Sequence, residues 1–353
     1  MKRLYLVIII ATYSLATKPL EAGPILTQIF GWGFNGAGAA SGTRPSTGQL
    51  DLASGVVRVS GDPLTNVTAI AAGYQHSLAL RSDGTVVGWG FNNCGQATGI
   101  EDGINGIVRI NGVVLSNVVA ISAGFFHSLA LLRDGNVVAW GNDGAGKASV
   151  PAGLSNVIAI SAGWSHSLAL KKDGTVVMWP NPIREGWRSP DLSSLSNIVA
   201  VATGKNVFGG GVDVVLKADS TVLAWSIKGG QIHAITGLSN VVAVAAGTES
   251  LALTKDGAVF EIGLDSDEAK QLGGVGNAVA IAAGGSRSLA LTRDGTVEVV
   301  WGDNYPYAPL EPVHLTNVIG IAAGDDFCLA IQANSAGPIT NAFPELPRLF
   351  GKP

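Results

Sequence analysis

Residues 154–179 read LSNVIAISAGWSHSLALKKDGTVVMW, and versions of this phrase recur seven times along the chain. In each version a glycine ends the first aliphatic run. These anchor glycines are Gly73, Gly124, Gly163, Gly204, Gly247, Gly284 and Gly324. They lie 37 to 51 residues apart, and a period near forty residues indicates one supersecondary unit per repeat. Such a unit buries its apolar faces only by packing on its neighbours, so we predict a repeat architecture.

The repeats contain short aliphatic runs that are typical of β-strands. In the second repeat, residues 118–121 read VVAI, residues 128–131 read SLAL and residues 137–141 read VVAWG. Runs of this length, bounded by glycine, indicate strands that are buried on both faces. Asp134-Gly135 separates the last two runs and predicts a tight hairpin, because glycine accepts a positive φ and aspartate tolerates it. The variable stretch after the third strand can supply a fourth, which predicts a β-propeller.

A tryptophan column gives the number of blades. The residues at this place are Trp89, Trp140, Trp179, Trp225, Ile262 and Trp301. The seventh repeat ends at Ile331 without a tryptophan, whereas residues 31–35 read GWGFN, as residues 88–92 do. We therefore predict that the N-terminal strand joins the C-terminal blade, which closes the ring and removes two exposed edges. The predicted fold is all-β, a seven-bladed propeller.

Residues 71–90, AAGYQHSLALRSDGTVVGWG, resemble the regulator of chromosome condensation repeat family. The resemblance covers about Ile29 to Ile331 and implies a seven-bladed propeller that serves as an interaction platform rather than an enzyme. The short blades and the Val150-Pro151-Ala152 junction resemble those of a secreted bacterial type that inhibits β-lactamase, which implies a secreted enzyme as the partner. The nucleotide-exchange type of the family is nuclear, whereas this chain begins like a secreted protein.

The two ends of the chain differ from the repeats. Residues 1–3 are MKR and are followed by an apolar run to Ala16. This pattern predicts a secretory signal peptide, because a membrane span needs ~20 apolar residues. We predict a signal peptide at 1–22, the propeller at 23–331, and a proline-rich linker or disordered tail at 332–353. The expected product is a monomer, secreted or in the cell envelope; an uncleaved anchor is the alternative.

The net charge and the cysteines indicate which partners and which cross-links to expect. The formal net charge is −4, so electrostatics provide no reason to expect nucleic acid as a partner. The chain has two cysteines, Cys94 and Cys328, and the repeat pattern places them on non-adjacent blades. We expect two free or buried thiols, although a secreted protein can form a disulfide.

The candidate catalytic and metal-binding residues are better explained by the repeat. His76, His127 and His166 occupy one position in successive repeats, so we predict a structural role for each. Zinc needs three or four converging ligands at about 2 Å, which this spacing does not supply. The hairpin aspartates are turn residues, and residues 265–268 lack the glycine of a calcium loop. We find no nucleophile elbow or phosphate-binding loop and expect no catalytic residue, metal or cofactor.

Two positions after each anchor glycine are not dictated by the fold, and three consecutive repeats place aromatic residues there. Because strand direction alternates, this turn and the loop after the tryptophan strand lie on the same face. This places Phe34, Phe91 and Trp187 near the aromatic turns. Exposed aromatic residues on one arc are typical of a binding hot spot. The alternative is that some of them pack between blades. The predicted partner-binding residues are Tyr74, Phe91, Phe125, Phe126, Trp164 and Trp187.

Other functions fit the same residues. The chain can be a structural module of a larger surface protein that continues after Gly337-Pro338. It can also bind glycans, because tryptophan and tyrosine stack on sugars. Guanine-nucleotide exchange is a further alternative, and it requires a cytoplasmic protein with a GTPase partner.

Overall fold

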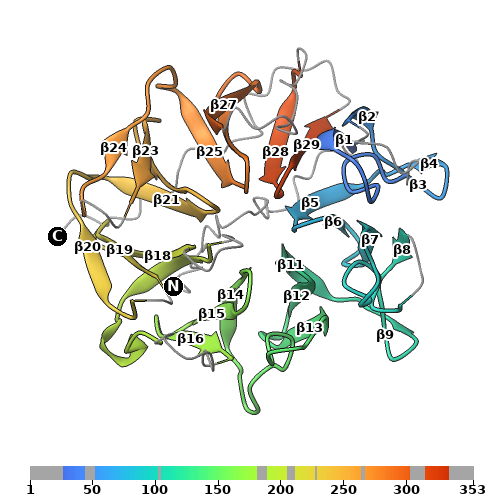
Figure 1. Ribbon diagram of the computed structural model, residues 1–353, viewed down its shortest axis with the longest axis horizontal. Coiled ribbons are helices and arrows are strands. Elements are labelled where there is room, and N and C mark those ends of the chain that lie inside the picture. Colours follow the sequence, from blue (N-terminus) through green and yellow to red (C-terminus); the bar gives the residue numbers. More distant parts are fainter. Residues whose placement is uncertain are drawn as a thin grey trace, which may run out of the picture.

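The computed structural model describes residues 27–43, 52–101, 105–180, 189–204, 211–226, 229–263, 267–302 and 315–333. Within these ranges seven antiparallel sheets of three or four strands are arranged around a central axis (Figure 1). This arrangement confirms the predicted seven-bladed propeller. The described ranges contain one short 3-10 helix, η1 (Leu192–Ser194). No helix within them is long and apolar enough to cross a membrane.

The first three blades begin at the centre of the ring and meander outward (Figure 1). Blade 1 consists of β5 (Val67–Ala72), β6 (His76–Arg81), β7 (Val86–Gly90) and β8 (Asn105–Ile107). Blade 2 consists of β11 (Val118–Ala123), β12 (His127–Leu132) and β13 (Val137–Gly141). Blade 3 consists of β14 (Val157–Ala162), β15 (Ser167–Lys171) and β16 (Val176–Trp179).

The next three blades follow the same path. Blade 4 consists of β17 (Ile198–Ala202), β18 (Val212–Lys217), β19 (Val222–Ser226) and β20 (Ile232–Ile235). Blade 5 consists of β21 (Val241–Ala246), β22 (Ser250–Thr254), β23 (Val259–Ile262) and β24 (Lys270–Gln271). Blade 6 consists of β25 (Ala278–Ala283), β26 (Arg287–Thr292) and β27 (Val297–Gly302). Two small hairpins lie outside the blades, β3 (Arg58–Val59) with β4 (Asp62–Pro63) and β9 (Arg109–Ile110) with β10 (Val113–Val114).

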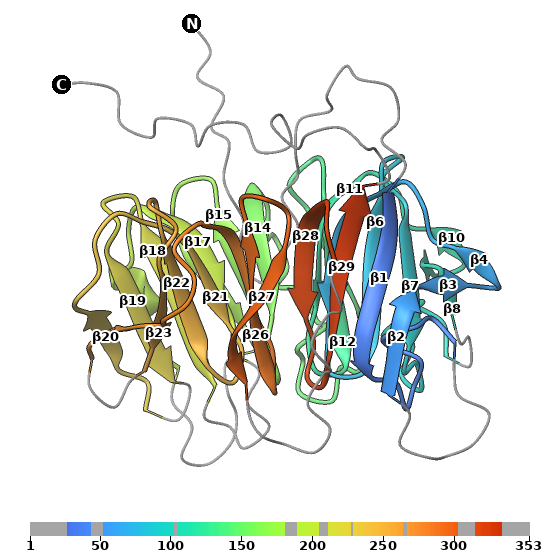
Figure 2. The ribbon, with the colours of Figure 1, turned by 90° about the horizontal axis from the view of Figure 1, so that it is seen from above.

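Blade 7 joins the two ends of the repeat region. Its sheet order is β2 (Leu52–Val56), β1 (Thr27–Phe34), β29 (Phe327–Ala333) and β28 (Val318–Ala323). Figure 2 shows the N-terminal β1 and β2 beside the C-terminal β28 and β29. Trp32 pairs with Cys328, as Trp89 pairs with Ser77 in blade 1. The predicted ring closure is therefore confirmed, and β29 runs to Ala333 rather than ending at the predicted Ile331.

The anchor glycines allow neighbouring blades to approach closely. The amide of the residue after one anchor glycine donates to the carbonyl of the next blade's anchor glycine, for example from Tyr74 to Gly124 at 3.1 Å and from Phe125 to Gly163 at 3.1 Å. A Cβ on Gly124 would lie 2.5 Å from the Gly163 carbonyl oxygen. A side chain at this place would therefore force the blades apart. The glycine is needed for this close approach.

The hairpins between the second and third strands use glycine for its backbone freedom. Gly84 and Gly135 have φ values of 80° and 85°, and Ser220 takes the same place in blade 4 with a φ of 70°. The prediction that the aspartate contributes by tolerating positive φ is wrong, because Asp83 is not among the positive-φ residues. Its carboxylate instead accepts the Thr85 amide at 2.9 Å, which is an Asx turn.

The core lies between blades rather than within one. One apolar cluster combines Ile29 and Leu329 of blade 7 with Ile70 and Val87 of blade 1. Another combines Leu168 of blade 3 with blade 4 residues that include Trp225. Each blade thus buries its faces against its neighbours, as expected for a repeat protein.

Candidate protein-binding face

Aromatic side chains from blades 1, 2 and 3 meet on one face of the ring. The ring centroids of Tyr74 and Phe125 are 4.3 Å apart, and those of Phe125 and Trp164 are 5.3 Å apart. Phe126 lies 4.2 Å from Phe125 and 5.7 Å from Phe91. We call this group the aromatic arc; its members are Tyr74, Phe91, Phe125, Phe126 and Trp164. Trp187, the sixth predicted residue, lies outside the described residues.

Backbone hydrogen bonds bring two loops of each blade together to form the arc. The Phe91 amide donates to the Gln75 carbonyl at 2.7 Å, and the Asn142 amide donates to the Phe126 carbonyl at 2.7 Å. These bonds tie the loop after the third strand to the turn before the second strand. The two segments therefore lie on the same face, as the alternation of strand direction predicts.

The arc residues are half-buried rather than fully exposed. Their rings pack on one another across the blade boundaries, so packing between blades and partial accessibility coexist. The indole Nε1 of Trp164 is buried and has no hydrogen-bond partner in the described part of the chain. The arc therefore offers a preformed apolar surface with part of each ring open to a partner.

The turn of blade 7 that lies next to Tyr74 is acidic and consists of Asp325 and Asp326. The Asp325 amide donates to the Gly73 carbonyl at 3.2 Å. Burial raises the pKa of the Tyr74 hydroxyl above its ordinary value, and the Asp325 and Asp326 carboxylates raise it further. The carboxylates are thus close enough to act on the edge of the aromatic arc. This neighbourhood was not predicted, because the acidic turn belongs to blade 7 and is far from Tyr74 in the sequence.

The three predicted structural histidines each connect one blade to the next. His76 Nε2 lies 2.9 Å from Ser128 Oγ, and His127 Nε2 lies 2.9 Å from Ser167 Oγ. Because Ser128 Oγ donates to the Gln96 carbonyl, it accepts from His76. Burial, and next the charge of Lys147, hold the pKa of His127 well below its ordinary value, so this ring is neutral at pH 7. We call these contacts histidine staples.

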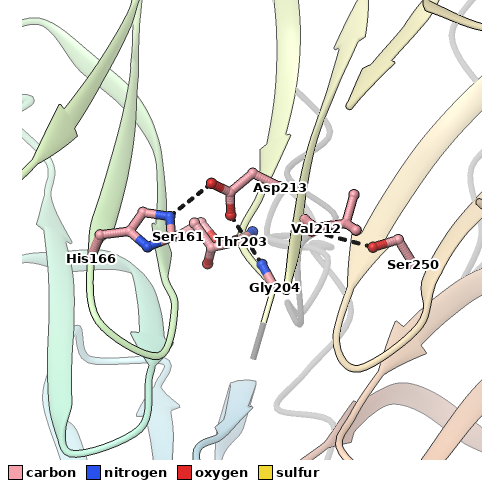
Figure 3. Close-up of polar contacts among 7 residues, drawn as sticks. All are labelled: Ser161, His166, Thr203, Gly204, Val212, Asp213 and Ser250. Atoms are coloured by element: carbon pink, nitrogen blue, oxygen red, sulfur yellow. Dashed lines mark hydrogen bonds and ion pairs between the residues drawn. The ribbon is translucent and has the colours of Figure 1, made fainter. Parts of the chain in front are cut away.

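The third staple uses a carboxylate in place of serine. His166 Nε2 lies 2.8 Å from Asp213 Oδ2, and both side chains are buried (Figure 3). The other oxygen of Asp213 accepts the Gly204 amide at 3.1 Å. In the next blade the pattern ends, because Val212 replaces histidine and Ser250 donates to the Val212 carbonyl at 3.3 Å (Figure 3).

Other polar residues of this face have structural partners. Asn92 closes the loop after the third strand of blade 1, since its Oδ1 accepts the amides of Ala97 and Thr98. Cys94 in this loop is half-buried and Cys328 is buried, and the two remain thiols that form no disulfide, as predicted. Among the described residues, no three or more His, Cys, Asp or Glu side chains form a group that could hold a metal ion.

Segments of the same three blades match a known family of repeats. Residues 67–96, 118–147 and 157–179 match the family model described as the Regulator of chromosome condensation (RCC1) repeat. Blades 1 to 3 contain regulator of chromosome condensation repeats. The matched segments begin with the first strands of blades 1, 2 and 3, so they include the three staple histidines and the arc.

Parts of the chain are similar in sequence to two curated proteins, and its fold is similar to that of a solved structure. Protein pim1 of Schizosaccharomyces pombe is 36% identical over 96 residues, which is 25% of this chain and 17% of pim1. The ultraviolet-B receptor UVR8 of Arabidopsis thaliana is 32% identical over 107 residues, 29% of this chain and 24% of the receptor. The matches thus span less than a quarter of either relative. The crystal structure of Prp20p from Saccharomyces cerevisiae superimposes with a TM-score of 0.67 at 20% identity, over 89% of this chain and 93% of Prp20p. This likeness shows that the fold is shared.

Proposed function

We propose that this protein is a non-catalytic binding platform that holds another protein against the aromatic arc. The observation that carries the proposal is the continuous contact of rings from three consecutive blades on one face. Aromatic residues dominate binding energy at protein interfaces because each buries a large area with few rotatable bonds. An arc of this kind is therefore suited to a protein partner.

The scaffold supports this role because it holds the arc in place before a partner binds. The backbone amides of Tyr74 and Phe125 are bonded to the next blade, and His76 and His127 follow directly after the aromatic turns. A partner then loses little free energy in ordering these side chains. Rigid aromatic surfaces of this kind convert buried area into affinity efficiently.

The partner and its location are part of the proposal. We propose that residues 1–22 direct export and that the partner is a secreted enzyme, which the resemblance to secreted inhibitors favours. The structure of Prp20p is described together with its binding properties to Gsp1p and histones. For this chain, that likeness supports only the general class, protein binding by a propeller of this fold.

Affinity capture tests the proposal directly. The exported protein, with its N-terminus checked by mass spectrometry, is the bait for envelope and culture-fluid proteins of the producing cell. The comparison baits are Tyr74→Ala/Phe125→Ala/Trp164→Ala and, as a control, Thr248→Ala at the equivalent turn of blade 5. We expect one protein to be retained by the wild type and the control. The triple variant should bind it at least about 100-fold more weakly, as expected for hot-spot truncations.

Thermal unfolding of each bait keeps the result interpretable. The arc rings pack on one another, so the triple variant is expected to unfold at a lower temperature, and binding is measured well below that temperature. Equal retention by all baits would place the binding site elsewhere. Binding on a glycan array that Trp164→Ala abolishes would favour the glycan-binding alternative. Retention of residues 1–22 in a cytoplasmic protein would favour nucleotide exchange instead.

A further inference from the structure

We propose that the bound partner presents an arginine or lysine whose charged end lies against the Asp325–Asp326 turn, beside Tyr74. Apolar residues of the same partner segment then pack on Phe125 and Trp164. This inference rests on the proposed function, because it states the chemistry of the segment that the aromatic arc binds.

Ring closure places the two carboxylates at the end of the arc. The Asp325 amide is bonded to the Gly73 carbonyl of blade 1, and the following residue, Tyr74, is bonded to Gly124 of blade 2. The acidic turn and the aromatic turns are therefore consecutive around the ring. Among the described turns at this place, only that of blade 7 carries two acidic residues.

The backbone of the acidic turn is held rigidly. The carbonyl of Asp325 accepts from the Ser286 amide at 2.7 Å and from the Ser286 hydroxyl at 2.9 Å. The carbonyl of Asp326 accepts from the Phe34 amide at 2.8 Å. Bonds from blade 6 and from β1 thus fix the backbone of this turn from both sides, so the turn that carries the carboxylates is in place before a ligand arrives.

Blade 6 leaves room for the carboxylates because its turn has small residues. The Asp325 side chain occupies the space that a Cβ on Gly285 would need. Asp325 and Asp326 are both half-buried, so part of each remains accessible. A cationic group approaching from the open side of the ring would meet these carboxylates and the Tyr74 ring together.

The electrostatics of the turn favour a cation. Asp326 takes part in none of the ion pairs that the described residues form. Burial raises the pKa of the Asp326 carboxyl group above its ordinary value. A partially desolvated carboxylate interacts with a cation more strongly than a fully hydrated one does. A basic side chain would therefore offset the cost of burying this charge.

A basic side chain also matches the aromatic neighbour. An arginine or lysine within about 6 Å of a tyrosine ring gains a cation–π interaction, and its hydrogen bonds to carboxylates are charge-assisted. Arginine fits best, because its planar guanidinium can stack on the ring while its edge donates to a carboxylate. The aliphatic stem then continues toward Phe125, so a basic residue next to an apolar one fits the whole surface.

Selection from a random-peptide phage library separates this inference from the proposed function. The baits are the wild type, Asp325→Asn/Asp326→Asn, Asp62→Asn as a remote control for lost charge, and the triple aromatic variant. We expect the wild type and the control to enrich peptides that contain arginine or lysine next to an apolar residue. The asparagine pair should enrich apolar peptides without this basic preference, and the triple variant should enrich none.

A synthetic peptide from the selection gives the quantitative test. Replacing its arginine by citrulline removes the charge and keeps the shape. We expect this replacement to weaken binding to the wild type about tenfold and to the Asp325→Asn/Asp326→Asn variant less than about twofold, because the coupled charge is gone. The single Asp326→Asn variant provides the same comparison if the double variant unfolds.

Each outcome has a distinct meaning. Peptides that depend on the aromatic residues but show no basic preference would overturn the inference and leave the proposed function standing. Equal weakening by citrulline in both backgrounds would also overturn it. If no peptide depends on the aromatic residues, the proposed function fails, and the inference fails with it.

Discussion

Blades 1 to 3 and blades 4 to 6 share the same three inner strands, and amide-to-carbonyl bonds between anchor-glycine turns occur in both groups, but their side chains differ at the turns. In the first half, histidine staples join the blades, and the two preceding positions carry the aromatic arc. In the second half, Val212, Glu249 and Arg287 take the place of histidine. The described turns of this half carry threonine, glycine and serine.

This difference shows that one repeat can be used in two ways. Both halves require glycine at the anchor position, because a Cβ on Gly124 or on Gly284 would collide with the carbonyl oxygen of the next blade's anchor glycine. The staples occur only where the turns carry large rings. We infer that they hold those turns at the positions in which the rings meet, which a preformed binding surface needs.

Alanine at an anchor glycine is expected to have the largest effect, and an equal one in both halves. A Cβ on Gly124 would meet backbone at 2.5 Å, and a Cβ on Gly284 would meet the Gly324 carbonyl oxygen at an even shorter distance. Gly124→Ala and Gly284→Ala should each lower the free energy of unfolding by about 3 kcal/mol or more, because the backbone has to shift. Urea unfolding measures this effect. Gly273→Ala, which meets no atom within 4 Å, is the control. A tolerant Gly284 would mean that only the first half is closely packed.

Removing the side chain at the staple position should destabilise the protein more in the first half than in the second. His127 is fully buried, and His127→Ala leaves a cavity and removes the bond to Ser167, so we expect a loss of about 3 kcal/mol. Arg287, at the same place in blade 6, is half-buried, and Arg287→Ala should cost about 1 kcal/mol. Urea unfolding of both variants gives the two values. Equal losses would contradict a special role for the staples.

The third staple allows a smaller test of the same idea. Asp213→Ala leaves His166 Nε2 and the Gly204 amide without their acceptor, whereas Asp213→Ser restores the residue used in blades 2 and 3. We expect the alanine variant to be about 2 kcal/mol less stable than the serine variant. Thermal unfolding, with a double-mutant cycle through His166→Ala, checks that the difference depends on the histidine. Similar stabilities of the alanine and serine variants would show that the staple does not need a hydrogen-bond acceptor at position 213.

The hairpins on the opposite face should show no difference between the halves, and their effect is the smallest. Hydrogen bonds from Thr175 are the main reason that the pKa of Asp173 is lowered from 3.8 to about 2, and hydrogen bonds from Thr221 lower the pKa of Asp219. Since the folded pKa lies below the unfolded value, the stabilisation is complete above about pH 4. It is lost as the pH falls toward 2.

Titration by NMR measures these carboxyl groups one by one. Thr175→Ala should raise the pKa of Asp173 toward its ordinary value and leave Asp219 unchanged. A shift of both groups would indicate that the acid effect is global rather than local to each hairpin.

Much of the structure could be predicted because it depends on periodic local signals. Glycine, tryptophan and Asp-Gly recur in register, and a recurring unit has to repeat its strands and turns. The GWGFN match also predicted that β1 would complete blade 7. One signal within the phrase was not interpreted: the asparagine before the first strand, as in Asn117 and Asn156, has a positive φ of 60° and 56°. Asparagine tolerates this conformation better than most residues.

The repeat pattern was therefore enough to predict the blade, the number of blades, the ring closure and the set of aromatic residues that the fold leaves free. How those residues meet became known from the arrangement of the blades. The rings are half-buried because neighbouring blades press their turns together, and Asp325 borders Tyr74 because the ring brings residue 325 beside residue 73. A repeat pattern specifies the contacts within each unit, whereas contacts between free positions depend on the distance and angle between blades, which no single repeat contains.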